Sequence, residues 1–168
     1  TAFYKDGDFG ICTRNCRIKD TPNSSAWNTL KELHIPEKMI KLGKNIAIQG
    51  ELLGWNIQKN KYKLKTNEYR YYLFNVFDID KFKPVPLNEI LEIAKELDLQ
   101  TVPILDTNYI LNFDIDKMVE YSKGQSVICP SVKREGLVIR SIDYIIDPVL
   151  GRLSFKIINP EFLIKFDE

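Results

Sequence analysis

Two glutamates of the sequence lie beside glycines, where a carboxylate can serve a ligand. Glu135 stands directly before Gly136, whose missing side chain would let a phosphate or a metal approach. Glu51 follows Gly50 at the expected end of a strand, where it can accept a hydrogen bond from a ribose hydroxyl or a metal-bound water. Carboxylate oxygens suit Mg²⁺, which keeps several waters and substrate phosphates in its shell. An exposed glutamate at a strand end is the alternative for Glu51.

Two cationic side chains add to this chemistry. Arg14, in the stretch TRN, would bind a ribose or a phosphate through two hydrogen bonds, a geometry that a lysine reproduces poorly. The alternative is a surface arginine paired with Asp8 or Asp20. Lys156 stands between two apolar residues of an expected strand, so its side chain points away from their face.

Four alternate residues of the stretch KNKYKLK are lysines: Lys59, Lys61, Lys63 and Lys65. If this segment is extended, all four lie on one side of it and can follow the backbone of an RNA strand. The alternative is that these lysines protect an exposed edge strand from pairing with another chain.

Lys5 precedes Asp6 and Gly7 at the expected tip of a hairpin formed by residues 1–13, in which Gly7 can adopt positive φ. A lysine nucleophile must be held in line with its target and be partly deprotonated at neutral pH. A hairpin tip in water provides neither condition. We therefore interpret Lys5 as a solvated turn lysine.

Composition limits the class of protein. The 168 residues fit one domain, and a hydrophobic content of 44% can fill a sizeable core. The 24 basic and 23 acidic residues nearly cancel, so any contact with nucleic acid must be local. No apolar stretch approaches the roughly 20 residues of a membrane span, which favours a cytoplasmic protein. Three cysteines and a single histidine, His34, are a poor supply of ligands for a structural zinc.

Short strands alternate with helices along the chain. The 24–42 stretch predicts two helices, with Ser24 or Ser25 as the first cap, Pro36 opening the second helix and Gly43 ending it. Further helices are expected at 86–99 and 114–124, strands at 45–53, 69–80, 136–141 and 152–159, and a turn at 147–151. Simple alternation places Phe77 on one face with Tyr71, Leu73 and Ile79.

Five stretches, in this order, carry a resemblance: CTRN (12–15), QGELLG (49–54), YLFNVFDI (72–79), REGLVIR (134–140) and SFKIIN (154–159). Together they resemble the covalent nucleotidyltransferase superfamily of DNA ligases, RNA ligases and mRNA capping enzymes, and most closely an RNA ligase branch. The resemblance runs from Phe9 to Lys165. It implies an α+β fold of mostly antiparallel sheets with flanking helices, a ligase-type, ATP-grasp-like nucleotidyltransferase domain over residues 1–168.

The resemblance also assigns roles to residues. It implies that Phe77 provides an aromatic face for adenine, that Glu51 and Arg14 hold the nucleotide, and that Glu135 serves the metal, Mg²⁺ or Mn²⁺. Lys156 would neutralise the α-phosphate. The commonest pattern of the superfamily has two lysines there, flanking one residue, but positions 154 and 158 are Ser and Ile. The S-F-K spelling is usual in the closest branch, and Lys165 is a source of the second charge.

The nucleophilic lysine of this superfamily lies in a K-x-D-G motif. Lys5 abuts Asp6 with no residue between them, and a shift of one residue along a strand turns a side chain to the opposite face. The family pattern places K-x-D-G upstream of this hairpin, so we expect it before Thr1 and expect this chain to lack its nucleophile segment.

The function implied is that of an ATP-dependent RNA ligase, which seals 5′-phosphate and 3′-hydroxyl RNA ends through lysyl-AMP and RNA-adenylate, as in RNA repair. One alternative within the same fold is a DNA ligase or a capping enzyme. Another is a non-catalytic module that binds a nucleotide or an RNA end.

Overall fold

The computed structural model describes residues 1–111, 114–149 and 151–166. The chain divides into two compact units. One, here called the sheet unit, comprises Thr1–Asn60 and Leu64–Val102; the other, the ribbon unit, comprises Lys61–Lys63 and Pro103–Glu168. No helix of the described residues combines the length and the apolar character required to cross a membrane.

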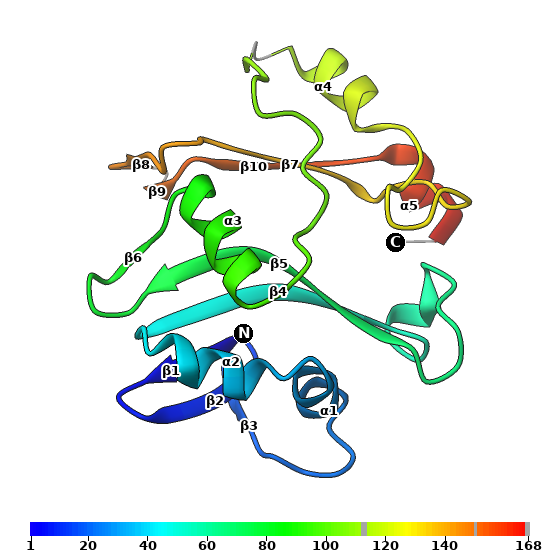
Figure 1. Cartoon of the computed structure of the whole chain (residues 1–168). Helices are drawn as coiled ribbons and strands as arrows, with labels where there is room; N and C mark the ends of the chain where they lie inside the picture. Colours follow the sequence, from blue (N-terminus) through cyan, green and yellow to red (C-terminus); the bar gives the residue numbers. More distant parts are fainter. Residues whose placement is uncertain (112–113, 150, 167–168) are drawn as a thin grey trace. The chain divides into compact units, whose positions relative to one another are not determined.

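The sheet unit is built on six antiparallel strands in the order β3-β2-β1-β4-β5-β6 (Figure 1). The strands are β1 (Ala2–Lys5), β2 (Asp8–Cys12), β3 (Arg17–Ile18), β4 (Ile46–Gly54), β5 (Tyr69–Asp78) and β6 (Lys83–Pro84). The predicted hairpin at the N-terminus is confirmed, since β1 pairs with β2 across a turn in which Asp6 and Gly7 have φ of 50° and 90°. Lys5 is exposed beside that turn.

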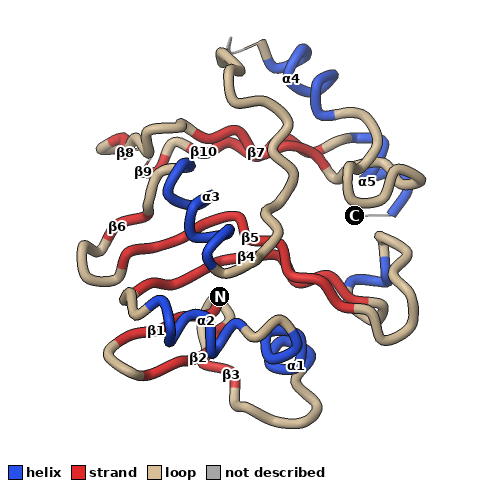
Figure 2. Tube along the Cα trace, in the orientation of Figure 1, coloured by secondary structure: helices blue, strands red, loops and turns tan. Residues whose placement is uncertain are grey.

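Helices α1 (Ser25–Glu32), α2 (Ile35–Leu42) and α3 (Leu87–Glu96) pack on this sheet through a single hydrophobic core (Figure 2). The predicted caps are confirmed: Ser24 accepts a hydrogen bond from the Trp27 amide, and Gly43 ends α2 with φ of 66°. The core joins Ile46 and Ile48 of β4 to Leu73 and Val76 of β5.

A β-bulge interrupts the pairing of β4 with β5. Gln49 pairs with Asn75 and Gly50 pairs with Leu73, so Phe74 is an extra residue on β5. A bulge of this kind reverses the alternation of side chains beyond it. Tyr71, Leu73 and Val76 therefore belong to the core. Phe77 lies on the opposite face, and its predicted grouping with Tyr71 and Leu73 is wrong.

The segment of alternating lysines is not extended. A 3-10 turn spans Gln58–Asn60, and Lys59, Asn60 and Lys63 have positive φ between 49° and 58°. These reversals send neighbouring side chains in different directions, so the prediction of four lysines on one side is wrong.

The described residues of the ribbon unit form two separate antiparallel ribbons and two helices. Strand β7 (Gly136–Arg140) pairs with β10 (Ser154–Ile158), and β8 (Ile146–Asp147) pairs with β9 (Gly151–Arg152). Helix α4 (Ile115–Ser122) is capped by the Asp114 carboxylate, and helix α5 (Pro160–Phe166) forms where the sequence predicted a short terminal segment.

Candidate nucleotide-binding and phosphate-binding residues

The face of the sheet opposite the core carries three successive cross-strand pairs of β4 and β5. Ala47 pairs with Phe77, Gln49 with Asn75, and Glu51 with Tyr72. A hydrogen bond of 2.7 Å from Asn75 Nδ2 to Gln49 Oε1 shows that the middle two side chains share this face. The structure thus brings the predicted Phe77 and Glu51 to one surface, separated by the pair of side-chain amides.

Phe77 is half-buried at one end of this surface. Its ring makes an edge contact with Phe82, with ring centroids 5.4 Å apart and an interplanar angle of 90°. Phe82 is itself 84% exposed, and the small residue opposite Phe77 is Ala47. The structure thus places a half-buried aromatic ring on this face, and a base can stack on a side chain of this kind.

Glu51 is exposed in the middle of β4, so its predicted place at the end of a strand is wrong. The flanking glycines do not form a turn either. A Cβ at Gly50 would lie 2.3 Å from Cζ of Tyr71, and one at Gly54 would lie 2.5 Å from Cδ1 of Tyr69. These glycines make space for tyrosine rings of β5, which holds the two strands in register.

Arg14 lies in the turn between β2 and β3 and is exposed. The expected alternative, a pairing with Asp8 or Asp20, is wrong. Arg17 donates two hydrogen bonds to Asp8, of 2.7 and 2.8 Å, while Lys31 pairs with Asp20 at 2.7 Å. Within the described part of the chain Arg14 makes no ion pair or hydrogen bond through its guanidinium, which leaves it available to an anion.

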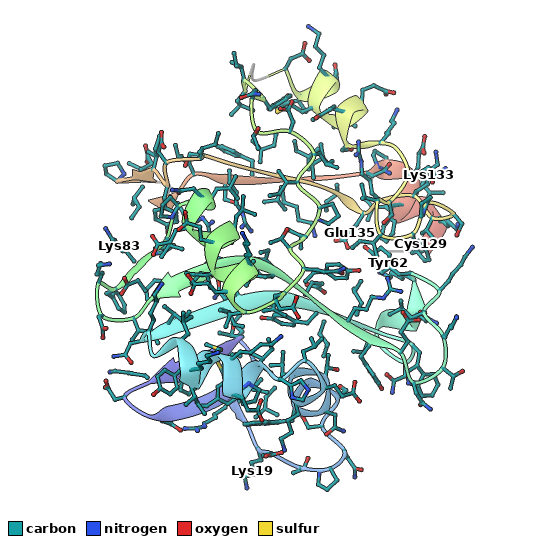
Figure 3. The ribbon with its side chains drawn as sticks, in the orientation of Figure 1. Lys19, Tyr62, Lys83, Cys129, Lys133 and Glu135 are labelled. Carbon is teal, nitrogen blue, oxygen red and sulfur yellow. The ribbon has the colours of Figure 1, made fainter. Side chains whose placement is uncertain are left out.

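Glu135 and Lys156, which are 21 residues apart, meet in the ribbon unit. Lys156 Nζ lies 2.6 Å from Glu135 Oε1, and both side chains are roughly half exposed, at 56% and 42%. Glu135, labelled in Figure 3, immediately precedes β7. Its backbone carbonyl accepts a hydrogen bond of 2.8 Å from the backbone N–H of Asn159. The ribbon therefore delivers a carboxylate and an ammonium to one point.

Gly136 has a different role from the one predicted. A Cβ at this position would lie 2.0 Å from the carbonyl oxygen of Ile157 and 2.9 Å from the Cα of Ile158. The missing side chain thus admits the backbone of β10, rather than a phosphate or a metal. Gly136 still contributes to the position of Glu135, because the close approach of β7 and β10 brings Lys156 within reach of the Glu135 carboxylate.

The remaining predicted lysines are dispersed. Lys61 is buried, with its ammonium 5.2 and 5.5 Å from the ring centroids of Phe162 and Phe166. Lys63 donates a hydrogen bond of 3.1 Å to Ser131, and Lys59 and Lys65 are exposed. Lys165 is exposed and lies 5.6 Å from the ring of Phe166. These side chains do not form a single track.

Three residues of the sheet unit were not singled out from the sequence. Arg17 covers the ring of Phe3 at 5.3 Å, next to its ion pair with Asp8. Asn75 and Gln49 form the amide pair described above. The signal for Asn75 was available, since it is the polar residue inside the otherwise apolar run from Tyr71 to Phe77.

Metal-binding capacity is limited to small sets of ligands. In the described ranges, no three His, Cys, Asp or Glu side chains come close enough together to hold a metal ion. Cys12, Cys16 and Cys129 are free thiols.

Comparison with known proteins agrees with this architecture. The chain resembles the solved structure of Naegleria gruberi RNA ligase with PPi, at a TM-score of 0.86 and 33% identity over 98% of this chain and 47% of that chain. A variant of that ligase solved with ATP and Mn gives a TM-score of 0.88 at 32% identity, over 99% of this chain and 48% of that chain. Another variant, solved with AMP and Mn, gives a TM-score of 0.86 at 33% identity, over 98% of this chain and 47% of that chain.

The chain thus spans about half the length of these solved relatives. A search of curated proteins found no match. The family model described as RNA ligase matches residues 1–158. The α+β arrangement of this chain, antiparallel sheets with flanking helices, matches that of the RNA ligase nucleotidyltransferase structure. The chain belongs to the RNA ligase family.

Proposed function

We propose that this chain is the adenylate-binding nucleotidyltransferase region of an ATP-dependent RNA ligase. The reaction joins a 5′-phosphate to a 3′-hydroxyl RNA end in three steps. A lysine attacks the α-phosphate of ATP and releases pyrophosphate, the AMP passes from the lysine to the RNA 5′-phosphate, and the 3′-hydroxyl attacks that 5′-phosphate and releases AMP. Family membership supports this assignment, and so do the complexes that the relatives form with ATP or AMP and Mn.

The sheet unit would bind the nucleoside. Phe77 offers a ring on which adenine can stack, and Glu51 on the same face offers a carboxylate to the ribose hydroxyls. Arg14, exposed and without a partner in the described part of the chain, would bind a phosphate or a ribose through its two forked N–H groups. Lys5 stands in water at the hairpin tip, so we do not assign the nucleophile to it.

The observation that carries the proposal is the 2.6 Å contact between Lys156 and Glu135. A site that handles phosphate must supply positive charge to the phosphate oxygens and an oxygen ligand to a divalent metal. These two side chains supply one of each. We propose that the α-phosphate takes the place of Glu135 as the partner of Lys156, which frees the carboxylate.

Glu135 fits Mg²⁺ or Mn²⁺ as a single carboxylate ligand, with the rest of the shell coming from waters and nucleotide phosphates. The fit rests on the chemistry of its carboxylate, which belongs to a side chain that is 42% exposed. A bound divalent ion would supply charge neutralisation at the phosphates. The RNA ends would be the partner of this site, and Lys59, Lys63 and Lys65 remain candidates for contact with the RNA backbone.

The test is the metal dependence of nucleotide binding by this chain. ATP affinity, measured by calorimetry with and without Mg²⁺, should increase with the metal in the native chain and be insensitive to it in Glu135→Gln. Lys156→Met should weaken ATP binding in both conditions. Lys117→Met is the control, since this lysine has the same charge, lies on α4 of the same unit and is paired with Asp114. If all four proteins bind ATP equally, or none binds it, the proposal is wrong.

GTP provides the comparison with a capping enzyme, and equal or tighter binding of GTP would favour that alternative. A nucleotide that binds without any effect of metal or of Lys156 would favour a non-catalytic binding module.

A further inference from the structure

The amide of Asn75 is the most unusual polar group of the sheet unit. Asn75 is only 3% exposed, and its Nδ2 donates a 2.7 Å hydrogen bond to Gln49. Its Oδ1 is buried and has no hydrogen-bond partner among the described residues. A buried acceptor without a donor is destabilising, and native proteins usually satisfy such groups unless the position has a function.

The position of Asn75 gives this acceptor a context. Asn75 lies on the face opposite the core, between the Phe77 pair and the Glu51 pair of β4 and β5. The bulge at Phe74 is what turns Asn75 to this face. Bulges are common beside active sites, where they redirect a side chain. Here one extra residue takes both Asn75 and Phe77 out of the core and places them side by side.

Gln49 fixes the orientation of the amide. Its Oε1 receives the Asn75 Nδ2 hydrogen bond across the strand pair, so the Asn75 oxygen is directed away from Gln49. The group that satisfies it must be a hydrogen-bond donor. A purine stacked on Phe77 would bring its edge to the neighbouring side chain on β5. Adenine has an amine donor at C6, whereas guanine and hypoxanthine have an acceptor oxygen there.

We propose that Asn75 is a specificity-determining residue, whose Oδ1 accepts a hydrogen bond from the C6 amine of adenine. This inference rests on the proposed function, because it requires the nucleobase to lie on Phe77. The Phe77 ring is half-buried and lies two residues from Asn75 along β5, on the same face of the sheet.

The test uses three nucleotides that differ only at C6 of the purine: AMP, purine riboside 5′-monophosphate, which has hydrogen there, and IMP, which has oxygen. Their affinities for the 168-residue chain are measured by calorimetry. The native chain should bind AMP about five- to tenfold more tightly than the purine riboside nucleotide, the worth of one neutral hydrogen bond to a buried acceptor. IMP should bind more weakly still, since two acceptors would face each other.

Two variants connect the preference to Asn75. Asn75→Leu keeps the size of the side chain and removes the acceptor, so AMP affinity should fall to that of the purine riboside nucleotide, whose own affinity should not change. Asn75→Asp keeps an acceptor oxygen and should retain the preference for AMP. A general loss of structure would lower both affinities together and leave their ratio unchanged.

Equal binding of all three nucleotides by the native chain would overturn the inference and leave the proposed function intact. A preference for IMP would also overturn it, because that preference requires a donor at this position. An undiminished preference for AMP in Asn75→Leu would show that a residue other than Asn75 recognises the C6 substituent, and would overturn the inference. Failure of the native chain to bind any of the three nucleotides would overturn both the inference and the proposed function.

Discussion

The sheet unit and the ribbon unit are held together in different ways. Strands β1, β2, β4 and β5 and the three helices of the sheet unit contribute to one core of sixteen buried residues. Among the described residues of the ribbon unit, the buried hydrophobic side chains are Val132 and Phe162, and its strands pair only in twos. A two-stranded ribbon is at best marginally stable without further packing. The two units should therefore differ in stability.

This difference corresponds to a difference in chemistry. The residues proposed for the nucleoside lie on the extensively packed sheet, which fixes their spacing through the register of β4 and β5. The Glu135–Lys156 pair lies on the less buried ribbon, where one ion pair between half-exposed groups contributes little to stability. We infer that the sheet unit provides a fixed binding surface and that the ribbon unit provides charges that rearrange when a phosphate binds.

The largest expected effect is on the sheet core. Leu73→Ala removes a side chain that is 0% exposed and should lower the free energy of unfolding by about 2–5 kcal/mol, through lost transfer energy and a cavity. Urea denaturation followed by tryptophan fluorescence measures it. The matched control is Leu91→Ala on α3, which is 41% exposed and should change stability by less than about 0.5 kcal/mol. Equal effects would contradict the description of this core.

A substitution at Gly136 should affect the ribbon unit alone. Gly136→Ala places a Cβ 2.0 Å from the Ile157 carbonyl oxygen and must push β7 and β10 apart, at a cost of about 1–3 kcal/mol. Hydrogen exchange should accelerate in 136–140 and 154–158, while the protection of β4 and β5 should not change. Val138→Ala, at a 52% exposed position of the same strand, is the control. Loss of protection throughout the sheet would show that the units unfold together.

AMP binding on the face of β4 and β5 that carries Phe77 should weaken when that ring is removed. Phe77→Ala should weaken AMP binding by about 1–3 kcal/mol, the worth of stacking a base on an aromatic side chain. Calorimetric titration with AMP measures it. Phe82→Ala removes the exposed ring in edge contact with Phe77 and should have a smaller effect. If the order of the two effects were reversed, adenine would stack on Phe82.

The smallest effect is expected at the rim of the sheet, where the hydrogen bonds from Arg17 hold the pKa of the Asp8 carboxyl below its ordinary value. A pKa that is lower in the folded state gives a stabilisation present above the unfolded pKa and lost as the pH falls through the folded one. The urea midpoint of the native chain should therefore decrease slightly between pH 5 and pH 2. In Asp8→Asn this decrease should be smaller, because the titrating carboxyl is absent. An identical pH profile in Asp8→Asn would show that this exposed pair does not contribute.

Local signals in the sequence were sufficient to predict most helices and strands and several of their ends. Ser24 caps α1, Gly43 ends α2 and Gly7 turns the first hairpin, because each of these residues satisfies a requirement of the backbone next to it. The family resemblance was also readable from short stretches and is confirmed by the match over residues 1–158. The roles of Arg14, Glu51, Phe77, Glu135 and Lys156 remain predictions.

Other features depended on contacts between segments distant in the sequence. Simple alternation along β5 placed Phe77 on one face with Tyr71 and Leu73, and only the pairing of β5 with β4 created the bulge that turned it to the other face. The partner of Asp8 is Arg17 instead of Arg14, because β3 pairs back on β2. Gly136 meets Ile157 because β10 returns to β7. The sequence by itself determined which residues carry the chemistry, through local backbone preferences and side-chain type. The tertiary structure decided which face they share, because strand register is set by the partner strand.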